Sequence, residues 1–308
     1  MPFGKNPKIK ILKQTKPGMC GGTDATLDTG APRTVNSREI VFFEASSMAP
    51  LPPDNIRKSR DVLHGFYAFA YPSGLGVFTL LELKAQRFQD NPRVCEFALL
   101  EDDFLPELAE LIMRHKVAEN NGFHSRTHGL PENFGGSVTV RYKSGELISI
   151  SDNQTPILTY SACADFAALF KKALSGSKAA CPSPDNISLI KYREERGEDD
   201  FRRAALTILA DGSGVIKKES RFSGPDIYES EKPVSPETVS AILRNIADTG
   251  LLLWNALPES SYPGGSAEKE LAFVLRDGSE LVIPGDRDPP EPIRQGFFNV
   301  ELELNVKN

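Results

Sequence analysis

The chain carries one short signature twice, and this repeat limits what the chain can fold into. An LPE triplet followed by GGS occurs at residues 130–137 and again at residues 257–266. Each copy leads into two apolar runs that are separated by a glycine-containing turn. Two such runs about a glycine predict a β-hairpin. Self-similarity at this distance predicts two related structural units.

The similarity extends towards the N-terminus of each signature. Residues 105–120 align without a gap with residues 235–250, and both segments have Pro-Glu at their second and third positions. Both have apolar residues at helical spacing, and Ser235 with Pro236 is a favourable helix start. A further hairpin and one β-prone run precede each helix. These runs are 39–44, 66–71 and 77–83 in the first half, and 187–192, 204–209 and 215–218 in the second.

The order of elements therefore predicts an α+β fold. We expect a tandem duplication of a strand–hairpin–helix–hairpin module, with antiparallel sheets and helices packed on one face. The expected organisation is a basic, loosely ordered arm (1–35), a first module (36–175), a linker (176–185) and a second module (186–308). The first module is expected to end in a helix over 161–174. The second is expected to end in a strand over 298–306, where apolar and polar residues alternate.

Composition narrows the function classes. The net charge is −6, and its acidic excess lies in the second half, which argues against nucleic acid as the partner. A role for the basic arm in contacting nucleic acid ranks last. Four scattered cysteines indicate a reducing compartment, and no apolar run is long enough to span a membrane. We therefore expect a cytoplasmic protein without a membrane association.

Local catalytic signatures are absent from the sequence. It contains no phosphate-binding GxxxxGK[ST] loop, no GxGxxG after a strand, no GxSxG elbow, no HExxH and no CxxC. We therefore predict no cofactor and no metal. A site whose residues meet only in the folded chain is not excluded by these patterns.

Two polar segments are the candidate binding residues. His124 and His128 lie four residues apart, but the surrounding glycines and Pro131 indicate a loop and not a metal-binding helix. Asp152, Asn153 and Gln154 follow the first hairpin and concentrate groups that can hydrogen-bond a ligand. A turn stabilised by Asp and Asn side chains explains the same residues.

We predict a binding or interaction protein of two related modules, whose partner is a protein or a small molecule. The alternative is a hydrolase, either cofactor-free or metal-dependent, that uses His124, His128 and Asp152 with Cys20 as a possible nucleophile. A hydrogen bond from either histidine to Asp152 or Cys20 within a cleft would favour the hydrolase.

Overall fold

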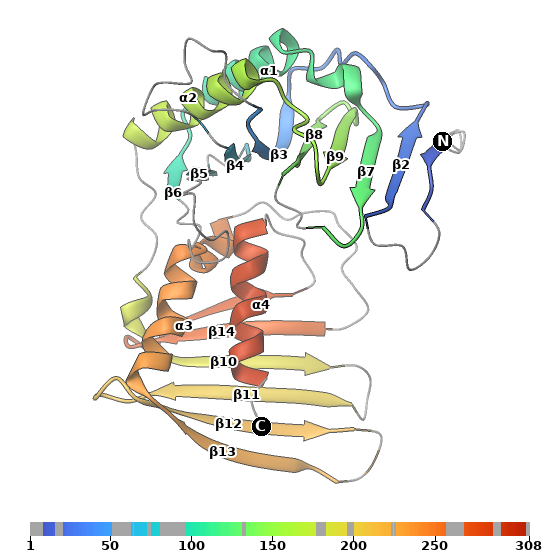
Figure 1. Ribbon diagram of the computed structural model, residues 1–308. Coiled ribbons are helices and arrows are strands. Elements are labelled where there is room, and N and C mark those ends of the chain that lie inside the picture. The colour runs from blue at the N-terminus through green and yellow to red at the C-terminus, as the bar shows by residue number, and fades with distance from the viewer. Residues whose placement is uncertain are drawn as a thin grey trace. The chain divides into compact units, whose positions relative to one another are not determined.

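The chain divides into two compact units, Met1–Ala179 and Ala180–Asn308. The computed structural model describes residues 9–15, 21–50, 63, 65–72, 75–80, 96–130, 134–176, 183–195, 200–222, 224, 226–256, 268–285 and 291–305. Over these residues the protein is mixed α/β, with four helices and two sheets in which antiparallel pairing dominates (Figure 1). None of the described helices is both long enough and apolar enough to cross a bilayer.

The first unit contains a nine-stranded sheet and two helices. Its elements are β1 (Ile9–Lys13), β2 (Thr23–Asp28), β3 (Ile40–Met48), β4 (Gly65–Ala70), β5 (Leu75–Leu80), β6 (Glu96–Leu99), α1 (Phe104–Arg114), η1 (Val117–Asn120), β7 (Phe123–Thr127), β8 (Gly136–Tyr142), β9 (Leu147–Asp152) and α2 (Tyr160–Gly176). The strands lie in the order β1-β2-β7-β9-β8-β3-β4-β5-β6. β7 and β9 pair in parallel, whereas the other neighbours are antiparallel.

Alternation along the strands builds the core of this unit. Phe43 and Ala45 on β3 are buried, as are Val138 and Val140 on β8. The ring of Phe43 lies 5.8 Å from the ring of Phe166 and 5.9 Å from that of Phe170, both on α2. The intervening residues of β3 and β8 point to the opposite face, because side chains alternate along a strand. We call this opposite side the outer face of the sheet.

The second unit contains a six-stranded sheet. Its elements are η2 (Pro184–Asn186), β10 (Ile187–Glu195), β11 (Phe201–Ile208), β12 (Gly214–Arg221), β13 (Tyr228–Val234), α3 (Pro236–Asp248), η3 (Leu251–Ala256), β14 (Glu268–Leu275), β15 (Glu280–Pro284) and α4 (Glu291–Asn305). The strand order is β13-β12-β11-β10-β14-β15. Figure 1 shows α3 and α4 lying across one side of this sheet. The opposite side is the outer face of the second unit.

The two units share a strand order. Read from β9 to β6, the first sheet runs β9-β8-β3-β4-β5-β6, and the second runs β15-β14-β10-β11-β12-β13. In each unit one helix follows the fourth of these strands in the chain and a second helix follows the last hairpin. The register also shifts at matching places, between Ile40 and Phe42 on β3 and between Ile187 and Leu189 on β10.

The C-terminal strand expected over 298–306 is wrong, because the structure has helix α4 there. The residues that α4 buries are Ile293, Phe297, Val300 and Leu304, which recur at helical spacing. Phe298 and Leu302 share the period-two pattern with Val300 and Leu304 but are exposed. The two exposed apolar residues therefore produced a strand-like period of two in the sequence of an amphipathic helix.

Two further expectations are corrected, one in the N-terminal segment and one at His124. Residues 9–13 and 23–28 lie in the segment expected to be loosely ordered, but they form β1 and β2. β2 is ordered by pairing with β7, which lies far along the chain. His124 was expected in a loop and lies within strand β7. Both errors have one cause, since pairing between distant segments is not visible in local sequence.

Candidate functional site

The structure brings the two polar segments chosen from sequence together. β7 and β9 pair in parallel, with His124 beside Ser151 and Ser125 beside Asp152. Residues 124–128 and 152–154 therefore lie at neighbouring strand ends. The side chain of Asn153 joins them directly, because its Oδ1 accepts from Thr127 N at 2.8 Å and its Nδ2 donates to Thr127 O at 2.9 Å.

Both histidines form hydrogen bonds to residues other than Asp152, one of the partners that would favour the hydrolase alternative. His124 Nδ1 lies 2.9 Å from Ser151 Oγ, and His128 Nε2 lies 2.8 Å from Asp24 Oδ2. The backbone N–H of Thr15, and then His128, lower the pKa of the Asp24 carboxyl below its usual range. Across the described residues, the hydrogen bonds found include none from either histidine to Asp152.

The Asp152 carboxylate stabilises the local turn. Its Oδ1 accepts hydrogen bonds from the backbone N–H groups of Gln154 at 2.8 Å and Thr155 at 2.9 Å. This is the geometry of an Asx turn. Cys20, the proposed nucleophile, lies outside the described residues. The described contacts of this region are those of a structural clamp between two strands, and the hydrolase alternative stays a prediction.

A row of polar side chains, of which five of the six bear a hydroxyl group, crosses the outer face of the first sheet. Cross-strand neighbours place six residues in line over β2, β7, β9, β8, β3 and β4. They are Thr26, His124, Ser151, Ser137, Ser46 and Tyr67. Tyr67 Oη donates a hydrogen bond to Glu44 Oε1 at 2.7 Å. Glu44 lies on β3, two residues before Ser46, on the same face of the sheet. The six side chains in line include no Asp, Glu, Lys or Arg.

The outer face of the second unit carries a row of charged side chains, which we call the charged row. It crosses β13, β12, β11, β10 and β14 on the outer face through successive directly opposed residues. Its members are Glu229, Glu219, Arg203, Arg193 and Glu270. The order of charge is therefore acidic, acidic, basic, basic, acidic. At the positions equivalent to Arg193 and Arg203 the first unit has Ser46 and Tyr67.

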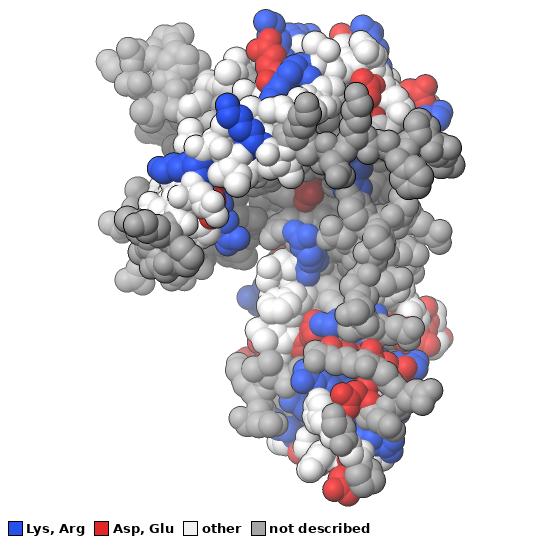
Figure 2. Space-filling model, turned by 90° about the vertical axis from the view of Figure 1, so that its right-hand side faces the viewer, with Lys and Arg blue, Asp and Glu red and all other residues white. Residues whose placement is uncertain are grey.

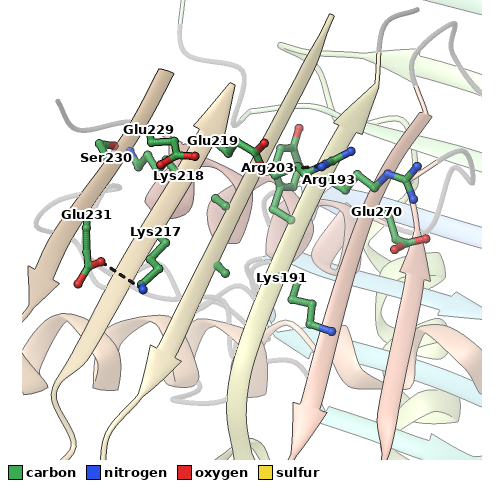
Figure 3. A pocket seen from close by; sticks show the side chains of 13 residues that line it. Lys191, Arg193, Arg203, Lys217, Lys218, Glu219, Glu229, Ser230, Glu231 and Glu270 are labelled. Atoms are coloured by element: carbon green, nitrogen blue, oxygen red, sulfur yellow. Dashed lines mark ion pairs between the residues drawn. The ribbon is translucent and has the colours of Figure 1, made fainter. Parts of the chain in front are cut away.

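A shallow hollow of about 640 Å³ lies over this row (Figure 3). Ala205 lies on its floor, with Lys191 and Lys217 as its direct cross-strand neighbours. The small side chain of Ala205 leaves space between two long ones. Figure 3 shows Lys217 turned towards Glu231, to which its Nζ is 3.2 Å distant. Lys191 Nζ likewise lies 3.0 Å from Glu280 Oε1, towards the opposite edge of the sheet.

The arginines of the charged row form partly solvent-exposed ion pairs. Arg193 and Arg203 share Glu195, with nitrogen–oxygen distances of 2.7 Å and 3.7 Å. Arg203 also lies 3.7 Å from Glu219. Each of these arginines is about half exposed, at 53 % and 49 %. Exposed pairs contribute roughly 0–1 kcal/mol each, so an incoming partner can rearrange them at small cost.

The line next to the charged row combines charged with small apolar side chains, and the line beyond it is largely apolar. Ala205 and Ala272 are direct cross-strand neighbours of Lys191 and therefore lie in one line with it across the sheet. Lys217 continues this line on one side, and the exposed Val282 continues it on the other. Leu189, Val215 and Val274 occupy the next line on the same face. Figure 2 shows basic and acidic side chains closely interleaved on the second unit. The outer face thus combines an apolar strip with an ordered set of charges.

Sequence reasoning missed this face. The residues of the charged row come from five separate strands, and they form a row only through the register of four pairings. The available signal was the alternation of apolar with charged residues over 190–193, which indicates one solvated face of that strand. That signal gives the face of each strand but not the neighbour across it.

Comparison with known protein families gives no matching family, and comparison with curated proteins gives no matching protein. Within the described part of the chain, no group of three or more His, Cys, Asp or Glu residues is placed to hold a metal ion.

Proposed function

We propose that this protein is a non-catalytic binding protein made of two units related by duplication, and that it docks a partner on the outer face of the second sheet. The shared strand order and the matching register shifts on β3 and β10 support the duplication. A register shift is a specific local irregularity of one strand pair. Its recurrence at the equivalent place in both units therefore supports a common origin more strongly than an equal number of strands does.

One observation carries the functional proposal. At three positions that the shared strand order equates, Ser137, Ser46 and Tyr67 of the first unit correspond to Glu270, Arg193 and Arg203 of the second. Arg193 and Arg203 are exposed, so the packing of a core does not require charged side chains at these two positions. Exposed, ordered charge serves partner selection, since it favours matching surfaces and disfavours others. We infer that the two units diverged to present different surfaces.

A paired capture experiment tests this function. The variant Arg193→Glu with Arg203→Glu reverses two charges on the outer face. The control Arg244→Glu with Arg276→Glu makes the same change of net charge at exposed positions on α3 and after β14. Captures from the native cells are compared by quantitative mass spectrometry. We expect a protein that the wild type and the control retain and the face variant loses by about tenfold or more.

Equal recovery by the two variants would contradict the proposal, as would an absence of any protein retained above background. Circular dichroism and urea unfolding of both variants establish that each remains folded. The exposed positions of Arg244 and Arg276 predict an unfolding free energy of the control within about 1 kcal/mol of the wild type. The face variant, whose row becomes entirely acidic, is expected to be less stable than the control but still folded.

A further inference from the structure

Two of the four neighbouring pairs in the charged row bring like charges together. Glu229 lies directly opposite Glu219, and Arg203 lies directly opposite Arg193. Like charges directly opposite on neighbouring strands destabilise a sheet. The same charges in alternating order would place every residue of the row beside one of opposite sign. The observed order suits a partner whose charges run in the complementary order.

The spacing of the row indicates which secondary structure such a partner has. Neighbouring strands are about 4.8 Å apart, so successive members of the row are separated by about that distance. An α-helix presents successive residues on one face every three or four positions, which is a rise of about 4.5–6 Å. An extended segment presents them about 6.6 Å apart and loses register within two strands. A helix lying across the strands therefore matches the row better.

The bordering side chains indicate that this helix is amphipathic. Ala205 provides space in the floor of the hollow, and Ala272 and Val282 lie in the same line next to the charged row. Leu189, Val215 and Val274 add apolar surface one line further along the strands. A helix with an apolar stripe beside a charged stripe would contact both features at once.

Resting on the proposed function, we propose that the outer face of the second sheet binds an amphipathic partner helix. The charged stripe of this helix reads basic, basic, acidic, acidic, basic at positions i, i+4, i+7, i+11 and i+14. The two basic residues face Glu229 and Glu219, the two acidic residues face Arg203 and Arg193, and the last basic residue faces Glu270.

Two synthetic helical peptides test this pattern. One has the block order Lys, Lys, Glu, Glu, Lys at those five positions, and the other has the alternating order Lys, Glu, Lys, Glu, Lys. Their composition and net charge are identical, so non-specific attraction to the acidic unit is the same for both. Fluorescence anisotropy at low salt measures the affinity of each labelled peptide for the full-length protein. We expect the block peptide to bind the wild type about tenfold more tightly.

A charge exchange in the protein supplies the matched control. The variant Glu219→Arg with Arg203→Glu keeps the composition but gives the row an alternating order. We expect it to prefer the alternating peptide. A second variant, Ala205→Phe, fills the hollow without changing charge and should lose affinity for the block peptide. This second variant keeps the test informative if the exchange variant fails to fold.

Equal affinities of the wild type for the two peptides, or a preference that the charge exchange does not reverse, would overturn the inference. If neither peptide binds but the capture experiment still shows a partner lost with Arg193 and Arg203, the helix pattern is wrong and the proposed function stands. If that capture contrast is also missing, the proposed function itself is overturned.

Discussion

Single polar residues hold this fold together at points that sequence patterns do not mark. Asn121 is only 2 % exposed and bonds three backbone groups from distant segments. Its Nδ2 donates to Pro32 O at 3.0 Å and Leu147 O at 2.7 Å, and its Oδ1 accepts from Ser149 N at 2.8 Å. It thus fixes the segment between η1 and β7 against β9.

Asn121→Ala should lower the free energy of unfolding by about 2–3 kcal/mol, because it removes a buried side chain that makes three partly buried hydrogen bonds to the backbone. The neighbouring Asn120 is exposed and provides the control, for which Asn120→Ala should change stability by no more than about 0.5 kcal/mol. Urea unfolding measures both. Similar losses at the two positions would show that Asn121 has no special structural role.

Tyr142 predicts a loss of stability at high pH. Burial, and then the charge of Glu146, raise the pKa of Tyr142 to about 12. In the unfolded chain the phenol titrates near 10, so the folded protein keeps this proton longer. A raised pKa gives stability that is fully present below about pH 10 and is lost as the pH rises towards 12. The loss is on the order of 2 kcal/mol.

Urea unfolding of the wild type and of Tyr142→Phe, between pH 9 and pH 11.5, measures this effect. The variant should show a shallower decline. It should not remove the decline entirely, because burial also raises the pKa of Tyr192. Parallel declines in the two proteins would mean that Tyr142 does not contribute.

At the scale of elements, local sequence predicted those with a consistent period and clear ends. The predicted helix over 235–250 corresponds to α3, where Ser235 Oγ accepts from Thr238 N and Pro236 occupies the first helical position. The hairpins of β8 with β9 and of β14 with β15 also lie where their apolar runs predicted them. α1 ends earlier than expected, since Lys116 adopts a left-handed conformation with φ of 54°.

Elements that depend on distant partners were not predictable in this way. β7 has the sequence FHSRT, which lacks an apolar alternation, and it is a strand because it lies between β2 and β9. β13 has the sequence YESEKPV, in which only Val234 is buried. The candidate residues at the end of β7 were found from sequence, but their mutual contact and the charged row required the strand order.

The helical assignment of α4 yields a sharp comparison between two leucines. Leu304 is fully buried and Leu302 is 40 % exposed, although a strand would place both on one face. Leu304→Ala should therefore lower the free energy of unfolding by about 2–5 kcal/mol, whereas Leu302→Ala should cost less than about 1 kcal/mol. Chemical denaturation of the two variants decides between the structures. Losses of equal size would favour the strand.

For the whole molecule, the division into two units predicts that the second can fold alone. The second unit has its own set of buried apolar residues on strands and on α4, among them Ile190, Leu206, Phe273, Val300 and Leu304. Residues 180–308 expressed by themselves should unfold in one cooperative transition and give a dispersed NMR spectrum. A collapsed, non-cooperative product would show that this unit needs the rest of the chain.

The central claim concerns where a partner binds, and site-specific photo-crosslinking in the native cells tests it most directly. A photoreactive residue at Thr207, which is exposed on the outer face of the second sheet, is compared with one at Ser240, which is exposed on α3. The account predicts a discrete adduct from position 207 that Arg193→Glu with Arg203→Glu abolishes, and none of comparable yield from position 240. No adduct from position 207, or the same adduct from both positions, would contradict it.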